Sequence, residues 1–297
     1  MLRNIIITVA ASLMLGCSPF NSDCVAVCGD DKVWIIDFAR SEGSNHKVLW
    51  RWQADNSVKG LSEEYINRLR TIDECKVVDN NRKMLVTSSS GCCVLIDIAT
   101  KEVLFYTTAR NAHSAELLPE GRIAVALSVH NSGLGNALEL YDIDQPDKCL
   151  YRDSLYSGHG VVWNAKRNSL FALGYQELRQ YKLKDWQSDS PSLERVATWT
   201  LPINEGHDLS AVDDDRMLIS GYEGVLWFDI TTEEFSPFEP LKDVKNVKSV
   251  NLDPKTERLI FTKGEESWWT HNVYQRNPDR VIQLDSAHLY KARPLTF

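Results

Sequence analysis

Three histidines recur at regular spacing along this chain, and their imidazoles could bind a metal ion or transfer a proton. They are His113, His159 and His207, which stand 46 and 48 residues apart. Each opens an apolar run that is followed by a polar turn, a second apolar run and a loop. Four short strands in roughly 40–45 residues are typical of a propeller blade, whose first strand lines a central channel. The spacing therefore predicts that the three imidazoles meet at one axis.

The remaining repeats extend this pattern to a whole ring. First strands are expected to begin near Glu74, near the three histidines and near Lys248. The amino-terminal part supplies three further strands with no first strand before them, and Leu289–Arg293 is a surplus strand at the other end. Pairing the surplus strand with Cys24–Cys28 completes a blade and removes an exposed edge. We therefore predict an all-β fold, a single six-bladed β-propeller of four-stranded blades over residues 24–297, closed by the C-terminal strand.

Two local patterns support the strand assignment. An apolar-Asp-apolar signature repeats at the end of the third strands, at Asp37, Asp97, Asp142 and Asp229, and is interpreted as stabilising a turn. Segments with helical periodicity are almost absent, and Ser62–Leu69 is the one helical candidate. A parallel fold with alternating strands and helices is therefore disfavoured.

Aligning the first strands predicts which side chains face the channel. One residue from each blade is expected at the same level: Glu74 (or Asp73, one position earlier), His113, His159, His207, Lys248 and Lys291. The loops between second and third strands should rise at the same end of the channel, and they carry His130, Tyr175, Tyr222, Trp268 and Trp269. Such a concave mouth is the expected binding site of the fold.

These residue types allow two chemical interpretations. In the first, the three histidines bind a divalent metal such as manganese, zinc or calcium and leave a position for substrate. In the second, the imidazoles act with Lys248, Lys291 and Arg293 to hold a carboxylate or sulfate. The two are compatible, because a metal can neutralise a carboxylate while a neighbouring base takes a proton. A third interpretation is structural, with the imidazoles hydrogen-bonded inside the channel.

Roles for the other mouth residues follow from the same hypotheses. Tyr175 and Tyr222 are candidate proton donors to a leaving oxygen, and Lys248 and Lys291 are candidate catalytic cations. An aromatic face suits the apolar face of a sugar ring, so Trp268 and Trp269 are candidate stacking residues. Glu74, His130 and Arg293 complete the predicted ligand-binding set. For the loop aromatics, packing within the blades is an equally good explanation.

The first residues resemble a bacterial lipoprotein signal. Met1–Asn4 contains one arginine, Ile5–Leu15 is apolar but too short to span a membrane, and Gly16-Cys17 follows. The resemblance implies a signal peptide over residues 1–16, acylation of Cys17 and a tether over residues 17–23. It also implies the outer membrane of a Gram-negative bacterium, facing the periplasm or the surface, with contact to the membrane through the lipid alone.

Composition narrows the classes of partner. The chain carries 33 Lys and Arg against 41 Asp and Glu, a formal net charge of −8, whereas nucleic-acid-binding domains are usually basic. Nucleic acid is therefore not an expected partner. Of the seven cysteines, none forms a Cys-x-x-Cys pair, and we expect most to be small buried apolar residues.

Several channel segments together resemble a family of exported bacterial six-bladed propellers of unknown function: Glu74-Cys75-Lys76, Ala112–Ser114, Gly158–Trp163, Gly206–Leu209, Val247–Ser249 and Tyr290–Arg293. The likeness covers residues 24–297 and implies a Bacteroides-type setting, where lipoproteins often serve glycan uptake. The three histidines also resemble, as a constellation, those of oligogalacturonate lyases. Those propeller enzymes bind manganese through three histidines and a glutamine, but have seven blades and different histidine spacing.

The sequence thus predicts a monomeric, exported lipoprotein that binds or processes an acidic oligosaccharide or another small anionic ligand in the channel. Processing would be metal-assisted elimination or hydrolysis. The alternative is a non-catalytic module that binds an anionic glycan or a protein at the same mouth.

Overall fold

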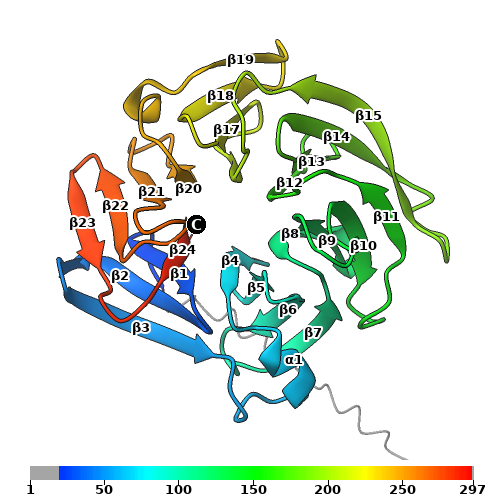
Figure 1. The fold of residues 1–297 in the computed structure, drawn as a ribbon, viewed down its shortest axis with the longest axis horizontal. Helices are drawn as coiled ribbons and strands as arrows, with labels where there is room; N and C mark the ends of the chain where they lie inside the picture. The colour runs from blue at the N-terminus through cyan, green and yellow to red at the C-terminus, as the bar shows by residue number, and fades with distance from the viewer. Residues whose placement is uncertain (1–19, 296–297) are drawn as a thin grey trace, which may run out of the picture.

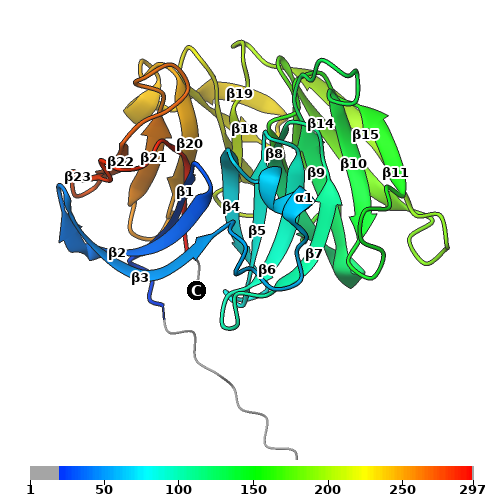
Figure 2. The same cartoon turned by 60° about the horizontal axis from the view of Figure 1, so that its bottom comes forward.

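The computed structural model describes residues 20–295 and confirms the predicted architecture. Six antiparallel four-stranded sheets stand around a central axis as the blades of a propeller (Figure 1). Seen from the side, the blades form a short cylinder with loops at both ends (Figure 2). We number the blades in chain order, so that the first is the one that contains both ends of the described chain.

The first three blades are built as follows, each from the axis outward. The first is β24 (Leu289–Pro294), β1 (Cys24–Gly29), β2 (Lys32–Glu42) and β3 (Asn45–Gln53). The second is β4 (Ile72–Val78), β5 (Lys83–Ser88), β6 (Cys92–Asp97) and β7 (Val103–Thr108). The third is β8 (Ala112–Leu118), β9 (Arg122–Leu127), β10 (Ala137–Asp142) and β11 (Tyr151–Ser154).

The other three blades repeat the same order. The fourth is β12 (Gly160–Asn164), β13 (Ser169–Leu173), β14 (Glu177–Lys184) and β15 (Ser192–Thr200). The fifth is β16 (Asp208–Ala211), β17 (Arg216–Ser220), β18 (Val225–Asp229) and β19 (Glu234–Pro237). The sixth is β20 (Val247–Leu252), β21 (Leu259–Lys263), β22 (Asn272–Arg276) and β23 (Arg280–Gln283).

Short helices join some of these strands. The predicted helical segment contains α1 (Glu63–Asn67), where Tyr65 packs on Tyr106 of β7 with ring centroids 4.5 Å apart. Single 3₁₀ turns, η1 (Pro119–Gly121) and η2 (Glu239–Leu241), occur in the third and fifth blades. The outer strands β11 and β19 have four residues each and no apolar run, which is why the sequence pattern did not indicate them.

The core consists of six apolar layers, one between each pair of neighbouring blades. Strand β1 shows why its sequence is continuously apolar. Cys24, Ala26 and Cys28 face the second blade, whereas Val25 and Val27 face the sixth, because successive side chains of a strand point to opposite sides. Both faces are buried, and small side chains suit the crowded axis.

The ring closes as the surplus terminal strand predicted. β24 pairs antiparallel with β1, with Ala26 opposite Arg293 and Val27 opposite Ala292. In Figure 1 the red end of the chain lies inside the blue amino-terminal strands, next to the axis. The first blade is therefore made from both ends of the described chain.

The repeated aspartates act in the turns, as predicted. In each case Oδ1 accepts a hydrogen bond from a backbone N–H two or three residues later, at distances of 2.8–3.1 Å: Asp37 from Arg40, Asp97 from Thr100, Asp142 from Asp144 and Asp229 from Thr231. These carboxylates fix the turn between third and fourth strands and are not candidates for chemistry.

Some predictions fall outside the described residues. Residues 1–16 and Cys17 are among them, so the signal peptide and the acylation site stay predictions. Within residues 20–295, no helix is both long and apolar enough to cross a bilayer. The six cysteines in this range are free thiols; five are buried and Cys149 is exposed, in agreement with their expected role as small core residues.

Candidate functional site at the channel mouth

Irregularities in the inner strands place a ring of side chains at one end of the channel. The pairing with the second strand shifts register at Asp73 in β4, at His113 in β8 and at Lys248 in β20. A bulge of this kind turns one side chain away from the regular alternation and is common next to functional sites. His159 and His207 come directly before β12 and β16, and their backbone N–H groups still bond to the second strand.

This ring opens into a pocket of about 390 Å³, a volume within the range of small-molecule sites. Its floor includes Asp73, the three histidines and Tyr290 of β24. Its walls come from the surrounding loops and include Tyr175, Glu205, Trp268 and Trp269. The convergence of His113, His159 and His207, expected from their spacing alone, is confirmed: neighbouring rings have centroids 4.3 and 5.3 Å apart.

Hydrogen bonds fix the orientation of two of these imidazoles. Nδ1 of His113 lies 3.1 Å from the Asn111 carbonyl oxygen, and Nδ1 of His159 lies 2.8 Å from the Ser157 carbonyl oxygen. Because a carbonyl only accepts, each Nδ1 carries the proton and each Nε2 keeps its lone pair. Burial lowers the pKa of His113 to about 4 and that of His159 well below its usual value. Both rings are therefore neutral at physiological pH.

His207 differs, because it is paired with a buried lysine. Nζ of Lys248 lies 2.8 Å from Nε2 of His207 and 5.9 Å from the centre of the Tyr290 ring. Burial lowers the pKa of Lys248 to about 7 and that of His207 well below its usual value. Among residues 20–295, no carboxylate forms an ion pair with Lys248. The pair therefore gains or loses a proton near neutral pH.

Asp73 brings a second titratable group to the floor. Its Oδ2 accepts a hydrogen bond from the backbone N–H of Ser89 at 2.5 Å. Burial raises the pKa of this carboxyl group to about 7. An acid in the pocket lining and a buried amine next to His207 thus have pKa values that are both moved towards neutrality, an arrangement that is more frequent at functional sites than elsewhere.

Beneath this ring, a compact cluster of four charges crosses the channel. Arg293 donates to Glu74 through Nε (2.8 Å) and Nη2 (2.7 Å), and to Asp208 through Nη1 (2.8 Å) and Nη2 (2.6 Å). Lys291 Nζ lies 3.1 Å from Asp208 Oδ1 and 3.5 Å from Glu74 Oε2. It also donates to the carbonyl oxygens of His113 and His159, each at 3.2 Å. The two cations therefore balance the two carboxylates inside the fold.

The balance is reflected in the acidity of the carboxyl groups. Burial alone would raise the pKa of Glu74 and Asp208, but the charges of Arg293 and Lys291 outweigh it and lower both values. All four side chains are almost completely buried. We call Glu74, Asp208, Lys291 and Arg293 the channel ion cluster.

The predicted level is corrected for Lys291, because Tyr290, one position earlier, takes its place beside the histidines. In β4 the expected alternative holds: Asp73, and not Glu74, stands at this level. The cause is the shift in register in β4 and β24, which a strict alternation of side chains does not reveal. Glu74, Lys291 and Arg293 lie in the channel ion cluster, below the pocket, where their polar atoms bind one another.

The loop residues divide into two groups. Tyr175, Trp268 and Trp269 line the pocket, and Trp268 is 61% exposed. Tyr222 is exposed and His130 is half-buried, and neither is part of the pocket wall; His130 Nδ1 lies 2.7 Å from Ser132 Oγ. Tyr290 and Glu205 were not predicted. Tyr290 could have been found only from the register of the closing strand.

The metal hypothesis for the three histidines stays a prediction. In the described part of the chain, the group whose possible ligand atoms all lie within 4.8 Å of one another is made of other residues. The three channel histidines are not grouped this closely. Of the three, His113 and His159 are oriented as metal ligands usually are, with the other ring nitrogen bonded to a carbonyl. Nε2 of His207 faces Lys248 instead.

Comparison with models of protein families identifies the family of this chain. A model of a family of unknown function, DUF6528, matches residues 31–296. The chain belongs to this family. The match extends from the turn before β2 to beyond β24, so it includes every strand of the propeller except β1. No curated protein matches the chain. The family carries no assigned activity, and any function has to be argued from the site.

Proposed function

We propose that the mouth pocket binds a small acidic sugar whose carboxylate is held next to His207 and Lys248. The observation that carries this proposal is the contact between His207, which lines a pocket walled by tryptophans, and Lys248, which is buried behind it. Lys248 forms no direct ion pair with a carboxylate among residues 20–295, although the charge of Glu205, whose Oε2 lies 4.0 Å from His207 Nε2, favours its charged form. Lys291 and Arg293 are neutralised within the channel ion cluster. An arriving carboxylate supplies a direct partner for Lys248.

The walls of the pocket suit a sugar ring. Trp269 makes a T-shaped contact with Tyr290, with centroids 5.5 Å apart, and its side chain is half-buried in the pocket lining. Trp268 is more exposed and stands on the same loop. Aromatic faces pack against the C–H face of a pyranose, while Asn111 and Ser157 of the rim can bond to hydroxyl groups. This combination selects a polar ring compound over a purely apolar one.

The change that tests the proposal is Lys248→Met, with digalacturonate as the probe. We expect the variant to bind it roughly 10–100-fold more weakly, the loss of one charge-assisted contact. Wild type should bind about tenfold more tightly at pH 6 than at pH 8. The bound anion raises the pKa of Lys248 above its free value of about 7, so binding takes up a proton. Isothermal titration calorimetry at the two pH values measures both effects.

The controls separate binding from folding. Lys248→Met removes a buried charge that has no carboxylate partner, so we expect the variant to stay folded. Lys255→Met, in the exposed turn that follows β20, should leave binding unchanged. A neutral disaccharide should bind weakly and without pH dependence. Equal binding of the neutral and acidic sugars, or wild-type affinity in Lys248→Met, would refute the proposal.

Metal-assisted cleavage of the same sugar is a second candidate, favoured by the orientation of His113 and His159. In an elimination, a base removes the proton next to the carboxylate, the glycosidic C–O bond breaks as a C=C bond forms, and the leaving oxygen takes a proton. Neutral Lys248 would serve as the base and Tyr175 as the acid. The ultraviolet absorbance of the unsaturated product, with and without Mn²⁺, detects this reaction in the samples prepared for calorimetry.

We further propose that Cys17 is acylated and holds the propeller at the outer membrane. The predicted tether of residues 17–23 is shorter than expected, because Phe20 packs in the core and Ser22 and Asp23 bond to Arg258. The support is the apolar stretch that ends in Gly16-Cys17. Cys17→Ala should move the protein from the membrane fraction to the soluble fraction of a Gram-negative host, whereas Cys149→Ala, which removes an exposed thiol, should not. Identical fractionation of wild type and Cys17→Ala would exclude the anchor.

A further inference from the structure

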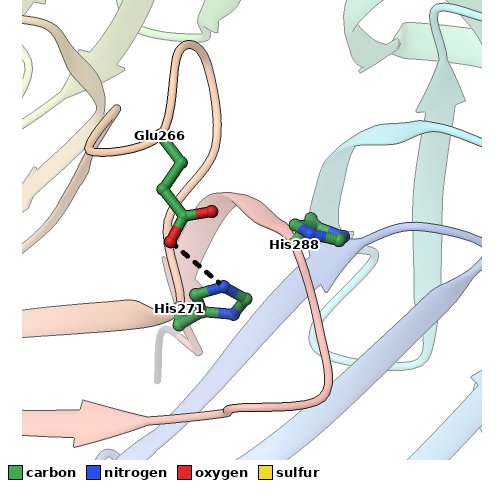
Figure 3. A group of neighbouring side chains, drawn as sticks. All are labelled: Glu266, His271 and His288. Atoms are coloured by element: carbon green, nitrogen blue, oxygen red, sulfur yellow. Dashed lines mark ion pairs between the residues drawn. The ribbon is translucent and has the colours of Figure 1, made fainter.

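A second cluster of metal-binding side chains lies on the same end of the propeller, outside the pocket. Glu266 and His271 belong to the loop between β21 and β22, and His288 directly precedes the closing strand β24. Figure 3 shows Glu266 and His271 facing each other, with His288 beside them on the neighbouring segment. One ligand atom from each residue lies within 4.8 Å of the others. We call Glu266, His271 and His288 the rim cluster.

Backbone pairing places these residues together. Thr270 and Leu289 form an antiparallel bridge, with N–H···O distances of 3.1 and 2.7 Å. Residues next to such a bridge face each other across the two segments, so His271 lies opposite His288. Their ring centroids are 5.3 Å apart. The cluster therefore rests on a hydrogen-bonded frame and does not depend on the chance approach of two free loops.

Each imidazole already has a partner for one nitrogen. Nδ1 of His271 lies 2.7 Å from the Ala287 carbonyl oxygen, and Nδ1 of His288 lies 3.1 Å from Asp30 Oδ1. Asp30 also accepts the backbone N–H of His288 at 3.2 Å. When Nδ1 donates to an oxygen, the lone pair is left on Nε2, and this is the usual arrangement behind metal-binding histidines. Nε2 of His271 is 3.6 Å from Glu266 Oε1.

We propose that the rim cluster is a binding site for a divalent transition metal, with zinc as the best match. Two imidazole nitrogens and one carboxylate, completed by water, form a ligand set that zinc accepts. Calcium and magnesium prefer oxygen ligands throughout and fit two imidazoles poorly. Asp30 is a positioning residue that orients His288. The inference does not depend on the ligand proposed for the pocket.

A metal ion at this site would link the wall of the pocket to the segment that leads into the closing strand. The loop that supplies Glu266 and His271 also carries Trp268 and Trp269 of the pocket wall. The segment that supplies His288 leads into β24, which closes the ring. A bound ion would therefore hold one wall of the pocket against the closing strand. Because it binds the folded chain alone, it should raise the melting temperature.

The test is zinc binding to metal-free protein, followed by calorimetry and by the melting temperature. We expect wild type to bind zinc and to melt at a higher temperature with it, and Co²⁺ to give the visible spectrum of a tetrahedral site. His271→Ala and His288→Ala should each weaken zinc binding more than about 100-fold. Asp30→Asn should weaken it about tenfold, the typical effect of an outer partner. His46→Ala, which removes a histidine of β3, is the matched control and should have no effect.

A double variant separates this site from the channel. His113→Ala combined with His159→Ala removes the channel imidazoles and should leave rim binding intact. Zinc binding that survives His271→Ala and His288→Ala but disappears in the channel variant would overturn the inference, as would the absence of zinc binding to wild type. Failure of the wild type to bind digalacturonate, with its zinc binding intact, would count against the pocket proposal alone.

Discussion

A chain that ends at Ser286, and therefore lacks β24, should not fold to a cooperative native state. The deletion removes the inner strand of the first blade, including Leu289, Tyr290 and Ala292, which are almost completely buried. Each large apolar side chain taken from a core costs about 1.5–3 kcal/mol. It also removes Lys291 and Arg293, so Glu74 and Asp208 lose the charges that compensate them. These losses together are comparable with the roughly 5–15 kcal/mol that stabilises a typical native state.

Scanning calorimetry and gel filtration measure the outcome, and two further variants serve as controls. A chain that ends at Leu295 keeps β24 and should melt as wild type does. A circular permutant with residues 285–295 placed before residue 20 restores the same strand as a hairpin with β1, because Val25 pairs with Pro294. Soluble, cooperatively melting protein from the Ser286 truncation would show that five complete blades suffice.

The repeat explains why the sequence alone predicted so much of this fold. Apolar runs separated by polar turns define each blade, and the unmatched Leu289–Arg293 strand specifies how the ring closes. The convergence of His113, His159 and His207 followed from the same periodicity, since equal positions of successive blades meet at the axis. These features depend on a count of strands and tolerate small errors in register.

The finer arrangement depends on single residues and could not be predicted. The bulges at Asp73 and His113 shift the strand pairing by one position, and hydropathy does not reveal them. For the same reason Lys291 was expected to meet a ligand, whereas it lies among buried carboxylates. The rim cluster unites residues from two loops with different spacing, so no periodicity indicates it. Which of several cations stays unpaired is a property of the assembled channel.

The charged side chains of the assembled channel form two layers, and we infer that each layer has a different role. The lower layer is internally balanced: Arg293 reaches both carboxylates with paired hydrogen bonds, and Lys291 adds contacts to backbone carbonyls of the third and fourth blades. It therefore links blades on different sides of the axis. The upper layer holds the Lys248–His207 pair and Asp73, and the pKa values of Asp73 and Lys248 lie near neutrality. The lower layer stabilises the ring, and the upper layer remains available for a ligand.

Arg293→Met should consequently lower the free energy of unfolding by about 3–5 kcal/mol, the usual cost of leaving buried charges uncompensated. Glu74 and Asp208 would then share Lys291 as their one remaining cation in the channel ion cluster. Urea denaturation followed by circular dichroism measures the loss. Arg40→Met is the matched control: its partner is Asp37, but its own side chain is 75% exposed, and it should change stability very little.

The double variant Arg293→Met with Glu74→Gln distinguishes charge balance from packing. It restores one cation, Lys291, against one carboxylate, Asp208, so we expect it to be more stable than Arg293→Met alone. If the losses of stability came from packing defects at two separate side chains, they would add. The double variant would then be less stable than Arg293→Met alone. If the two single losses simply add, the charges of this cluster do not compensate one another. If the double variant recovers stability, the lower layer acts as one electrostatic unit that joins the blades across the channel.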